Sequence, residues 1–359
     1  MASKRPDDNT GNNKPQGSSP VEDAPLLIGH GSKQGKNRKG GSKWHFGAAR
    51  ISGRRTGAAK RGADKSRPEF TPPAEAESLS ELELLTGYEA AKNETFGLLE
   101  EIAQKKVVPQ EPLRSVSAEL SNRLEVTSPA TIMSLINALA PVDEYLPRHS
   151  VNVSLLNGLF GFWMGLPKKE IDNLVLIGLL HDCGKALIPP KVLMAPRKLT
   201  IVEFEVIKMH TVNSYDLLDE FPEPLRNAAR SHHERVCGYG YPDFLSDEEI
   251  PYESRITAIS DIYDAMVSQR AYKKALSPFK ILKILTEMRD TDLDSWLVDV
   301  FIDHMPLELL RKPVVMSDGT FGIVQSFDPE DPEFPVIEIA GQPVKCNEGL
   351  YCVSMYTED

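Results

Sequence analysis

The sequence predicts a mainly α-helical body with a small β-rich element near its C-terminal end and a long basic tail at its N-terminal end. Apolar side chains make up 41% of the 359 residues and charged side chains 26%, an ordinary balance for a globular protein. Between residues 75 and 311, apolar positions recur every three or four residues, the period of an amphipathic helix. Over the last 48 residues they form short runs separated by turn residues, which is typical of strands. This composition excludes a fully disordered, a collagen-like and a disulfide-stapled chain.

The predicted tail covers residues 1–74. Residues 1–70 contain 15 Lys and Arg against 6 Asp and Glu, whereas the rest of the chain carries a net charge of −20, for a total of −11. A segment this rich in Gly, Ser, Asn and Lys has too few apolar side chains to bury a core, so we expect disorder. The simplest interpretation is a solvated arm. Trp44 and Phe46 favour the alternative, in which the arm contacts a polyanion or an anionic membrane surface.

Residues 75–140 are predicted to form helices that serve packing alone. Leu85 and Tyr88 recur at helical spacing, and Ser128 before Pro129 is typical of the start of a helix. We find no candidate for catalysis in this segment.

Residues 141–311 are predicted to form the main helical domain, and residues 312–359 a small β-rich element. Within the helical domain, Thr200 and Glu203 have the spacing of a capping box at a helix start. Residues 314–327 have the pattern of a β-hairpin, and further strands are expected after it.

The sequence favours a cytoplasmic location. The run Leu174–Leu180 is far shorter than the roughly 20 apolar residues that cross a bilayer. Lys4 and Arg5 are not followed by the apolar stretch of a signal peptide. The four cysteines form no CxxC motif, and we interpret them as reduced thiols.

Histidine and aspartate residues gather on the inward faces of the predicted helices. Five of the eight histidines lie between residues 149 and 233, and two aspartates share their helix faces with apolar positions. A single buried histidine is usually a satisfied core group, but seven such groups need a common partner. Divalent metal ions take neutral imidazole and carboxylate as ligands. The candidate ligands are His149, His181, Asp182, His210, His232, His233 and Asp261.

Seven donors exceed the shell of one tetrahedral ion, so the sequence predicts at least two metal ions. Asp182 is the candidate bridge between them. Adjacent residues on a helix diverge by about 100°, so His232 and His233 are predicted to serve different ions or different roles.

A longer set of motifs carries the resemblance to a known family. In chain order these are His181-Asp182-Cys183-Gly184-Lys185, His232-His233-Glu234-Arg235, Gly238-Tyr239-Gly240-Tyr241-Pro242 and Arg255 to Ala265 around Asp261. Over residues 140–305 the chain resembles the HD-GYP family, which belongs to the HD superfamily of metal-dependent phosphohydrolases. The resemblance implies an HD-domain helical bundle.

The resemblance also implies an enzyme, a phosphodiesterase that hydrolyses cyclic di-GMP to pGpG and in some members onward to GMP. It implies that the seven donors hold two divalent ions, iron or manganese, with nickel, zinc and magnesium as alternatives. Some members hold a third metal through a Glu one turn before the first histidine. Tyr145 stands at that position, with Glu144 beside it, so a third metal is not predicted.

The chemistry expected of such a site is in-line attack on phosphorus by a metal-bridging hydroxide, with the ribose 3′ oxygen as leaving group. Asp182 and Lys185 are the predicted catalytic residues, and Lys185 would reach the scissile phosphate. The predicted substrate-binding residues are Lys185, Gly240, Tyr241, Pro242, Arg270 and Lys273. Arg270 and Lys273 would hold phosphate oxygens, and the alternative for these two is a solvated helix end. The loop of Gly240, Tyr241 and Pro242 would shape a guanine pocket, and the alternative is a plain surface turn.

The match has departures, and they leave alternatives open. Cys237 stands where the family usually has Asp, and Ala195-Pro196-Arg197 replaces a typical KPG turn. One alternative is a sensor or adaptor that binds cyclic di-GMP and signals to a protein partner. Another is a hydrolase of a different cyclic dinucleotide or nucleotide. The complete ligand set favours the active enzyme. Glu234 is interpreted as a residue that orients an imidazole.

Overall fold

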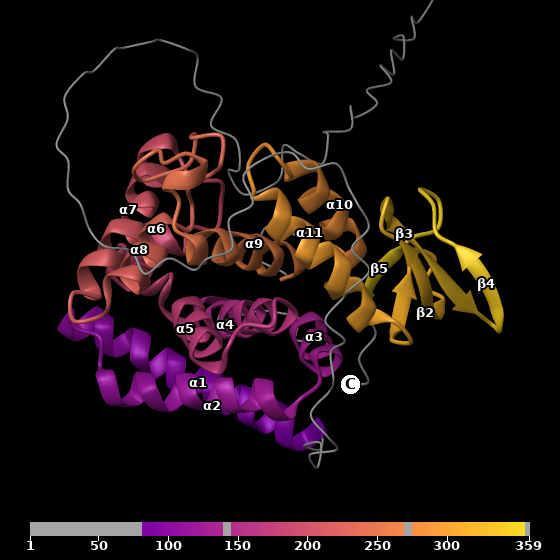
Figure 1. The fold of residues 1–359 in the computed structure, drawn as a ribbon, viewed down its shortest axis with the longest axis horizontal. Coiled ribbons are helices and arrows are strands. Elements are labelled where there is room, and N and C mark those ends of the chain that lie inside the picture. The colour runs from indigo at the N-terminus through magenta and orange to yellow at the C-terminus, as the bar shows by residue number, and fades with distance from the viewer. Residues whose placement is uncertain (1–80, 139–144, 269–274, 356–359) are drawn as a thin grey trace, which may run out of the picture. The chain divides into compact units, whose positions relative to one another are not determined.

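The computed structural model describes residues 81–138, 145–268 and 275–355, which form the helices and strands in Figure 1. Every described element lies within Lys65–Asp359, one of the two units into which the chain divides. That unit is mainly helical and carries an antiparallel sheet in its C-terminal part, so the predicted fold class is confirmed. The predicted disordered tail lies outside the described residues, and the predicted domain boundaries stay predictions.

The described helices vary in length from four residues to 25. In chain order they are α1 (Glu81–Lys105), α2 (Gln110–Val126), α3 (Pro129–Ala138), α4 (Tyr145–Trp163), α5 (Lys168–Leu180), α6 (Pro190–Leu193), α7 (Ile201–Leu217), α8 (Glu223–Ser231), α9 (Tyr252–Val267), α10 (Pro278–Met288) and α11 (Ser295–His304). Three short 3-10 turns are η1 (Cys183–Leu187), η2 (Asp247–Glu249) and η3 (Met305–Leu309).

The central helices α4, α5 and α9 contact one another and form the core of the unit. Every residue of α9 from Ile256 to Val267 is buried, which is typical of a helix enclosed on all sides. Gly178 lets α5 cross α4 closely, because a Cβ at this position would lie 2.5 Å from the Ser154 Cα. Within the residues that the structure describes, we find no helix that is both long and apolar enough to span a bilayer.

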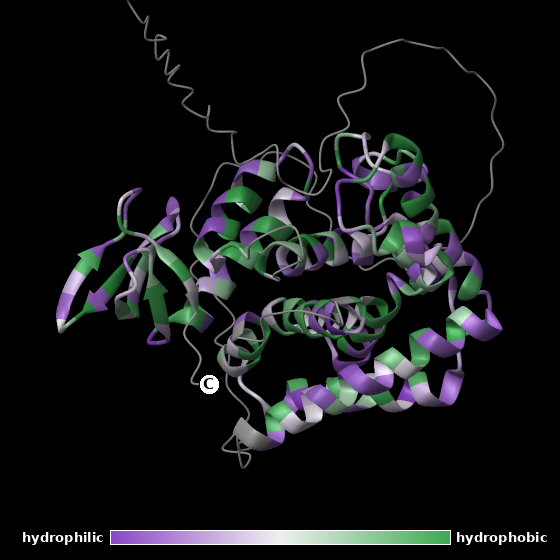
Figure 2. Cartoon of the chain, turned by 180° about the vertical axis from the view of Figure 1, so that it is seen from behind, coloured by the Kyte–Doolittle hydropathy of each residue, from purple (hydrophilic) through white to green (hydrophobic). Residues whose placement is uncertain are grey.

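Helices α1 and α2 pack against each other, and both contact α4 (Figure 1). Apolar and polar residues alternate along these two helices, whereas the central helices are more uniformly hydrophobic (Figure 2). The buried side chains of α1 and α2 include Tyr88, Ile102, Val116 and Leu120. Residues 81–126 therefore form a layer on the central helices, as their periodicity predicts.

The C-terminal sheet has five antiparallel strands in the order β4-β3-β2-β1-β5. The strands are β1 (Pro313–Met316), β2 (Phe321–Asp328), β3 (Asp331–Ile339), β4 (Gln342–Lys345) and β5 (Cys352–Met355). The predicted hairpin is the β1–β2 pair. The sequence interpretation missed β4, an edge strand with no buried residue and therefore no apolar alternation. Helix α10 packs on β3, where Lys280 pairs with Glu333.

Candidate metal centre

Five helices deliver side chains to one buried cluster. Helix α5 ends at Leu180 and α8 ends at Ser231, so His181 and His232 are the C-cap residues and the chain turns directly after them. His149 comes from α4, His210 from α7 and Asp261 from α9. The turn after α5 fits closely against α7, because a Cβ on Gly184 would lie 2.1 Å from the His210 carbonyl oxygen. The close packing of η1 on α7 thus brings Asp182 beside His210.

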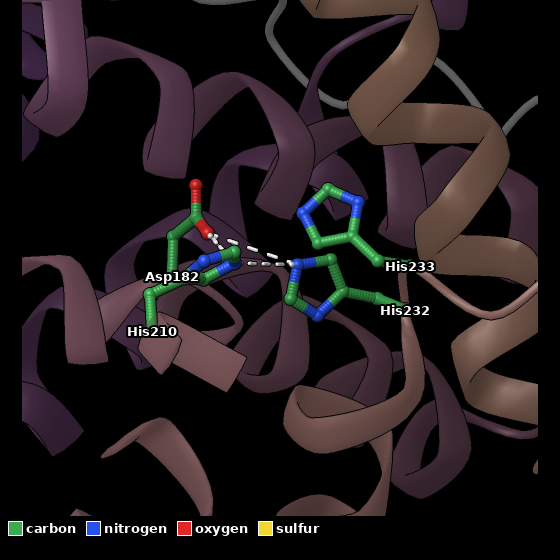
Figure 3. A group of neighbouring side chains, drawn as sticks. All are labelled: Asp182, His210, His232 and His233. Carbon is green, nitrogen blue, oxygen red and sulfur yellow. Dashed lines mark hydrogen bonds and ion pairs between the residues drawn. The ribbon is translucent and has the colours of Figure 1, made fainter. Parts of the chain in front are cut away.

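One group of ligand atoms consists of Asp182, His210, His232 and His233, all within 4.8 Å of one another (Figure 3). The Asp182 Oδ1 lies 3.2 Å from the His210 Nε2 and 3.7 Å from the His232 Nε2. The rings of His232 and His233 are 4.2 Å apart between centroids. Both histidines belong to this group of ligand atoms, and their service to different ions or in different roles stays a prediction.

A second group consists of His149, His181 and Asp182. The Asp182 Oδ2 lies 3.4 Å from the His149 Nε2 and 3.3 Å from the His181 Nε2. Asp182 therefore belongs to both groups, with one carboxylate oxygen toward each. This is the arrangement expected of a carboxylate that bridges two ions.

Asp261 lies beside both groups without belonging to either. Its Oδ1 is 3.2 Å from the His149 Nε2, and its Oδ2 is 3.9 Å from the His233 Nδ1. The structure thus brings together all seven predicted donors, and their role as metal ligands stays a prediction.

Backbone carbonyls orient three of the imidazoles. The Nδ1 atoms of His181, His210 and His232 lie 2.7, 2.7 and 2.8 Å from the carbonyl oxygens of Gly178, Ile207 and Ala229, each three residues earlier. A carbonyl only accepts hydrogen bonds, so each Nδ1 carries the proton. The Nε2 lone pairs are thereby left for the cluster, as in histidines that bind metals.

Burial and neighbouring charges keep the donors in their metal-binding protonation states. Burial lowers the pKa of His232 to about 4 and that of His233 well below its usual value. Burial alone would raise the pKa of Asp182, but Lys185 and the adjacent histidines hold this pKa well below its ordinary value. At neutral pH the two imidazoles are neutral and Asp182 is a carboxylate.

A divalent ion fits this donor set. The His181 Nε2 and the Asp182 Oδ1 are buried, and neither has a hydrogen-bond partner among the described residues. Buried polar atoms without partners are rare and mark a missing ligand, water or ion. Two or three imidazoles lie on each side of the shared Asp182 carboxylate. Iron, manganese and zinc accept such ligands.

The predicted substrate-binding residues have different outcomes. Lys185 contacts the Asp182 carboxylate at the edge of the cluster. Gly240 is approached closely by the backbone of the preceding turn, because a Cβ would lie 2.3 Å from the Glu234 Cα. Tyr241 stacks on His233 at 4.6 Å between ring centroids, and Pro242 follows it. Arg270 and Lys273 lie outside the described residues. All six roles stay predictions.

Glu234 does not orient an imidazole as interpreted from the sequence. Its carboxylate instead accepts hydrogen bonds from the backbone amides of Asp243 and Leu245, at 2.7 and 3.0 Å. The reason is that the chain leaves the helix before Glu234 and folds a loop back over it. Glu234 therefore anchors the loop that carries Tyr241.

The sequence interpretation missed Asp264, which orients His149. The Asp264 Oδ2 lies 2.7 Å from the His149 Nδ1, and its Oδ1 accepts from the Asn152 side chain at 2.6 Å. Both partners are spaced three residues from a predicted ligand, Asp264 after Asp261 and Asn152 after His149. Polar residues at this spacing inside a buried stripe were the available signal.

Comparison with known proteins shows what the region around this cluster is similar to. Residues 133–297 match the HD domain family. The cyclic di-GMP phosphodiesterase response regulator RpfG of Xanthomonas campestris is 35% identical over 185 residues, 50% of this chain and 49% of that protein. The cyclic di-GMP phosphodiesterase of Thermotoga maritima is 36% identical over 147 residues, 40% of each. The 3′3′-cGAMP-specific phosphodiesterase 2 of Vibrio cholerae is 30% identical over 185 residues, 50% of this chain and 35% of that protein.

A solved structure supports the fold. Bd1817, an HDG"Y"P protein from Bdellovibrio bacteriovorus, aligns with a TM-score of 0.51 and 16% identity over 61% of this chain and 70% of that one. The two proteins share a helical fold over this region. Residues 133–297 match the HD domain family and the chain is similar to several cyclic di-GMP phosphodiesterases, so the resemblance seen in the sequence is confirmed. It spans about half the length, or less, of the curated relatives described above.

Proposed function

We propose that this chain is a metal-dependent phosphodiesterase that hydrolyses cyclic di-GMP to pGpG. The observation that carries the proposal is Asp182, whose two carboxylate oxygens face two separate groups of histidines. Two bound divalent ions would lower the pKa of a water between them and neutralise charge on the phosphodiester. The relatives named as cyclic di-GMP phosphodiesterases support this substrate.

In the proposed reaction, one water oxygen forms a bond to phosphorus while the bond from phosphorus to the ribose 3′ oxygen breaks. The leaving oxygen takes up a proton, and the linear product keeps its 5′-phosphate. Asp182 and the histidines fix where the phosphodiester lies relative to the water. Lys185 is the side chain placed to contact a phosphate oxygen or to give the leaving oxygen its proton, since its ammonium group lies at the Asp182 carboxylate.

The second candidate is hydrolysis of 3′3′-cGAMP, which differs from cyclic di-GMP in one base. It is favoured by the similarity to the cGAMP-specific phosphodiesterase of Vibrio cholerae. Both substrates present the same phosphodiester to the cluster, so the metal centre does not separate them. The loop that carries Tyr241 is the candidate determinant of base preference.

The test uses the full chain, purified without oxygen and loaded with iron or manganese. Cyclic di-GMP and 3′3′-cGAMP are offered separately, and the products are identified by chromatography and mass, which also reveals any onward hydrolysis to GMP. We expect Asp182→Asn to abolish hydrolysis, whereas Asp172→Asn, a surface position on α5, should leave it unchanged. Loaded wild-type protein that leaves both dinucleotides intact would refute the proposal.

A further inference from the structure

A chain of buried hydrogen bonds connects α1 to the candidate metal centre. The Tyr88 hydroxyl of α1 donates to the Asn152 Oδ1 at 2.7 Å, and the Asn152 amide donates to the Asp264 Oδ1 at 2.6 Å. The other oxygen of Asp264 lies 2.7 Å from the His149 Nδ1. All four side chains are no more than 1% exposed, so water does not compete for these bonds.

Each bond in this chain has only one chemically consistent direction. Burial raises the pKa of Tyr88, so its hydroxyl keeps its proton and donates. The carboxylate of Asp264 only accepts, and therefore the Nδ1 of His149 carries the proton that faces it. The Nε2 of His149 then faces the metal cluster, 3.4 Å from the Asp182 Oδ2 and 3.2 Å from the Asp261 Oδ1.

Asp264 is also held by a second set of hydrogen bonds, which reaches the same oxygen as Asn152. The Ser268 hydroxyl donates to the Asp264 Oδ1 at 3.3 Å, and Arg148 donates to the Ser268 hydroxyl at 2.8 Å. Arg148 lies on α4 and Ser268 directly follows α9, and both of these helices contribute residues to the cluster. Tyr88 is the one described member that comes from α1, outside residues 133–297 that match the HD domain family.

We propose that Tyr88 is a positioning residue that couples α1 to the ion held by His149, His181 and Asp182. It fixes the Asn152 amide, which fixes Asp264, which in turn sets the tautomer and ring orientation of His149. A displacement of α1 that breaks the bond between Tyr88 and Asn152 weakens metal binding without touching a ligand. This inference rests on the proposed function only in that the cluster binds metal.

The test compares Tyr88→Phe with Tyr263→Phe in the full chain. Tyr263 is a matched control, because it is also fully buried and its hydroxyl also donates to an asparagine side chain, Asn137, at 2.8 Å. Mn²⁺ affinity is measured for each of the two sites by calorimetry with a competing chelator, and thermal unfolding is measured on the metal-free proteins. One hydrogen bond contributes about 0.5–1.5 kcal/mol, so we expect Y88F to weaken one site roughly threefold to tenfold.

The control decides between positioning and packing. We expect both variants to unfold at a lower temperature and only Y88F to lose metal affinity. Equal metal affinity in Y88F and Y263F, or wild-type affinity in Y88F, overturns the proposal. If Y88F does not fold, Asn152→Ser interrupts the same chain from α4 and is judged by the same criterion. A protein that binds Mn²⁺ with this pattern but hydrolyses neither dinucleotide refutes the proposed function and leaves the coupling intact.

Discussion

The substitution Asp264→Asn tests how the structure prepares His149 for metal binding. The side chain keeps its size, but one carboxylate oxygen becomes an amide that donates hydrogen bonds. In the wild type, Asp264 accepts from His149 on one oxygen and from Asn152 and Ser268 on the other. Whichever of the two positions the amide nitrogen of D264N takes, it therefore faces a group that already donates. If it faces His149, the imidazole must move its proton to Nε2 and loses the lone pair that would bind metal.

The expected cost follows from these contacts. Loss of a partner that orients a metal-binding histidine typically weakens metal affinity by about 10–100-fold, which corresponds to about 1.4–2.7 kcal/mol. Two opposed buried donors also cost about 1–3 kcal/mol of folding free energy. We therefore expect D264N to bind Mn²⁺ more weakly at one site and to unfold at a lower urea concentration, with Asp172→Asn as the surface control. Wild-type affinity at both sites in D264N would show that Asp264 does not set the state of His149.

Two further predictions concern the loop after α8 and the response to acid. Gly240→Ala should destabilise the chain by about 1–3 kcal/mol, because the new Cβ meets the backbone of Glu234. Gly97→Ala is the control, because a Cβ at this position has no neighbour within 4 Å, and it should be neutral or slightly stabilising. Thermal unfolding measures both. In metal-free protein, burial lowers the pKa of His232 to about 4, against about 6.5 in the unfolded chain. As the pH drops from about 6.5 to about 4, the unfolded chain therefore takes up a proton before the folded one does. The free energy of unfolding falls by up to about 3 kcal/mol over this range. Urea unfolding from pH 7 to pH 4 measures this loss; a slope as steep in His232→Gln as in the wild type would contradict the assignment to His232.

Hydrophobic periodicity predicted the helical body and the inward faces of its helices. His149 and Asp261 lie within buried stripes of α4 and α9, so their side chains had to enter the interior. The same reasoning failed where the helix stops. Because α8 ends at Ser231, the chain folds into a loop and the Glu234 carboxylate accepts hydrogen bonds from that loop and not from an imidazole. A helix end depends on tertiary contacts that periodicity does not contain.

Periodicity also cannot assign partners to buried polar groups. Tyr88 and Tyr263 have the same residue type, the same burial and the same kind of partner, an asparagine side chain. The partner of Tyr88 lies 64 residues away and leads to His149, whereas the hydroxyl of Tyr263 ends at Asn137 on α3. From the sequence, both are equally good core residues. Their difference arises only when α1 packs on α4, and for this reason the ligand motif alone identifies the metal cluster but not the side chains that orient it.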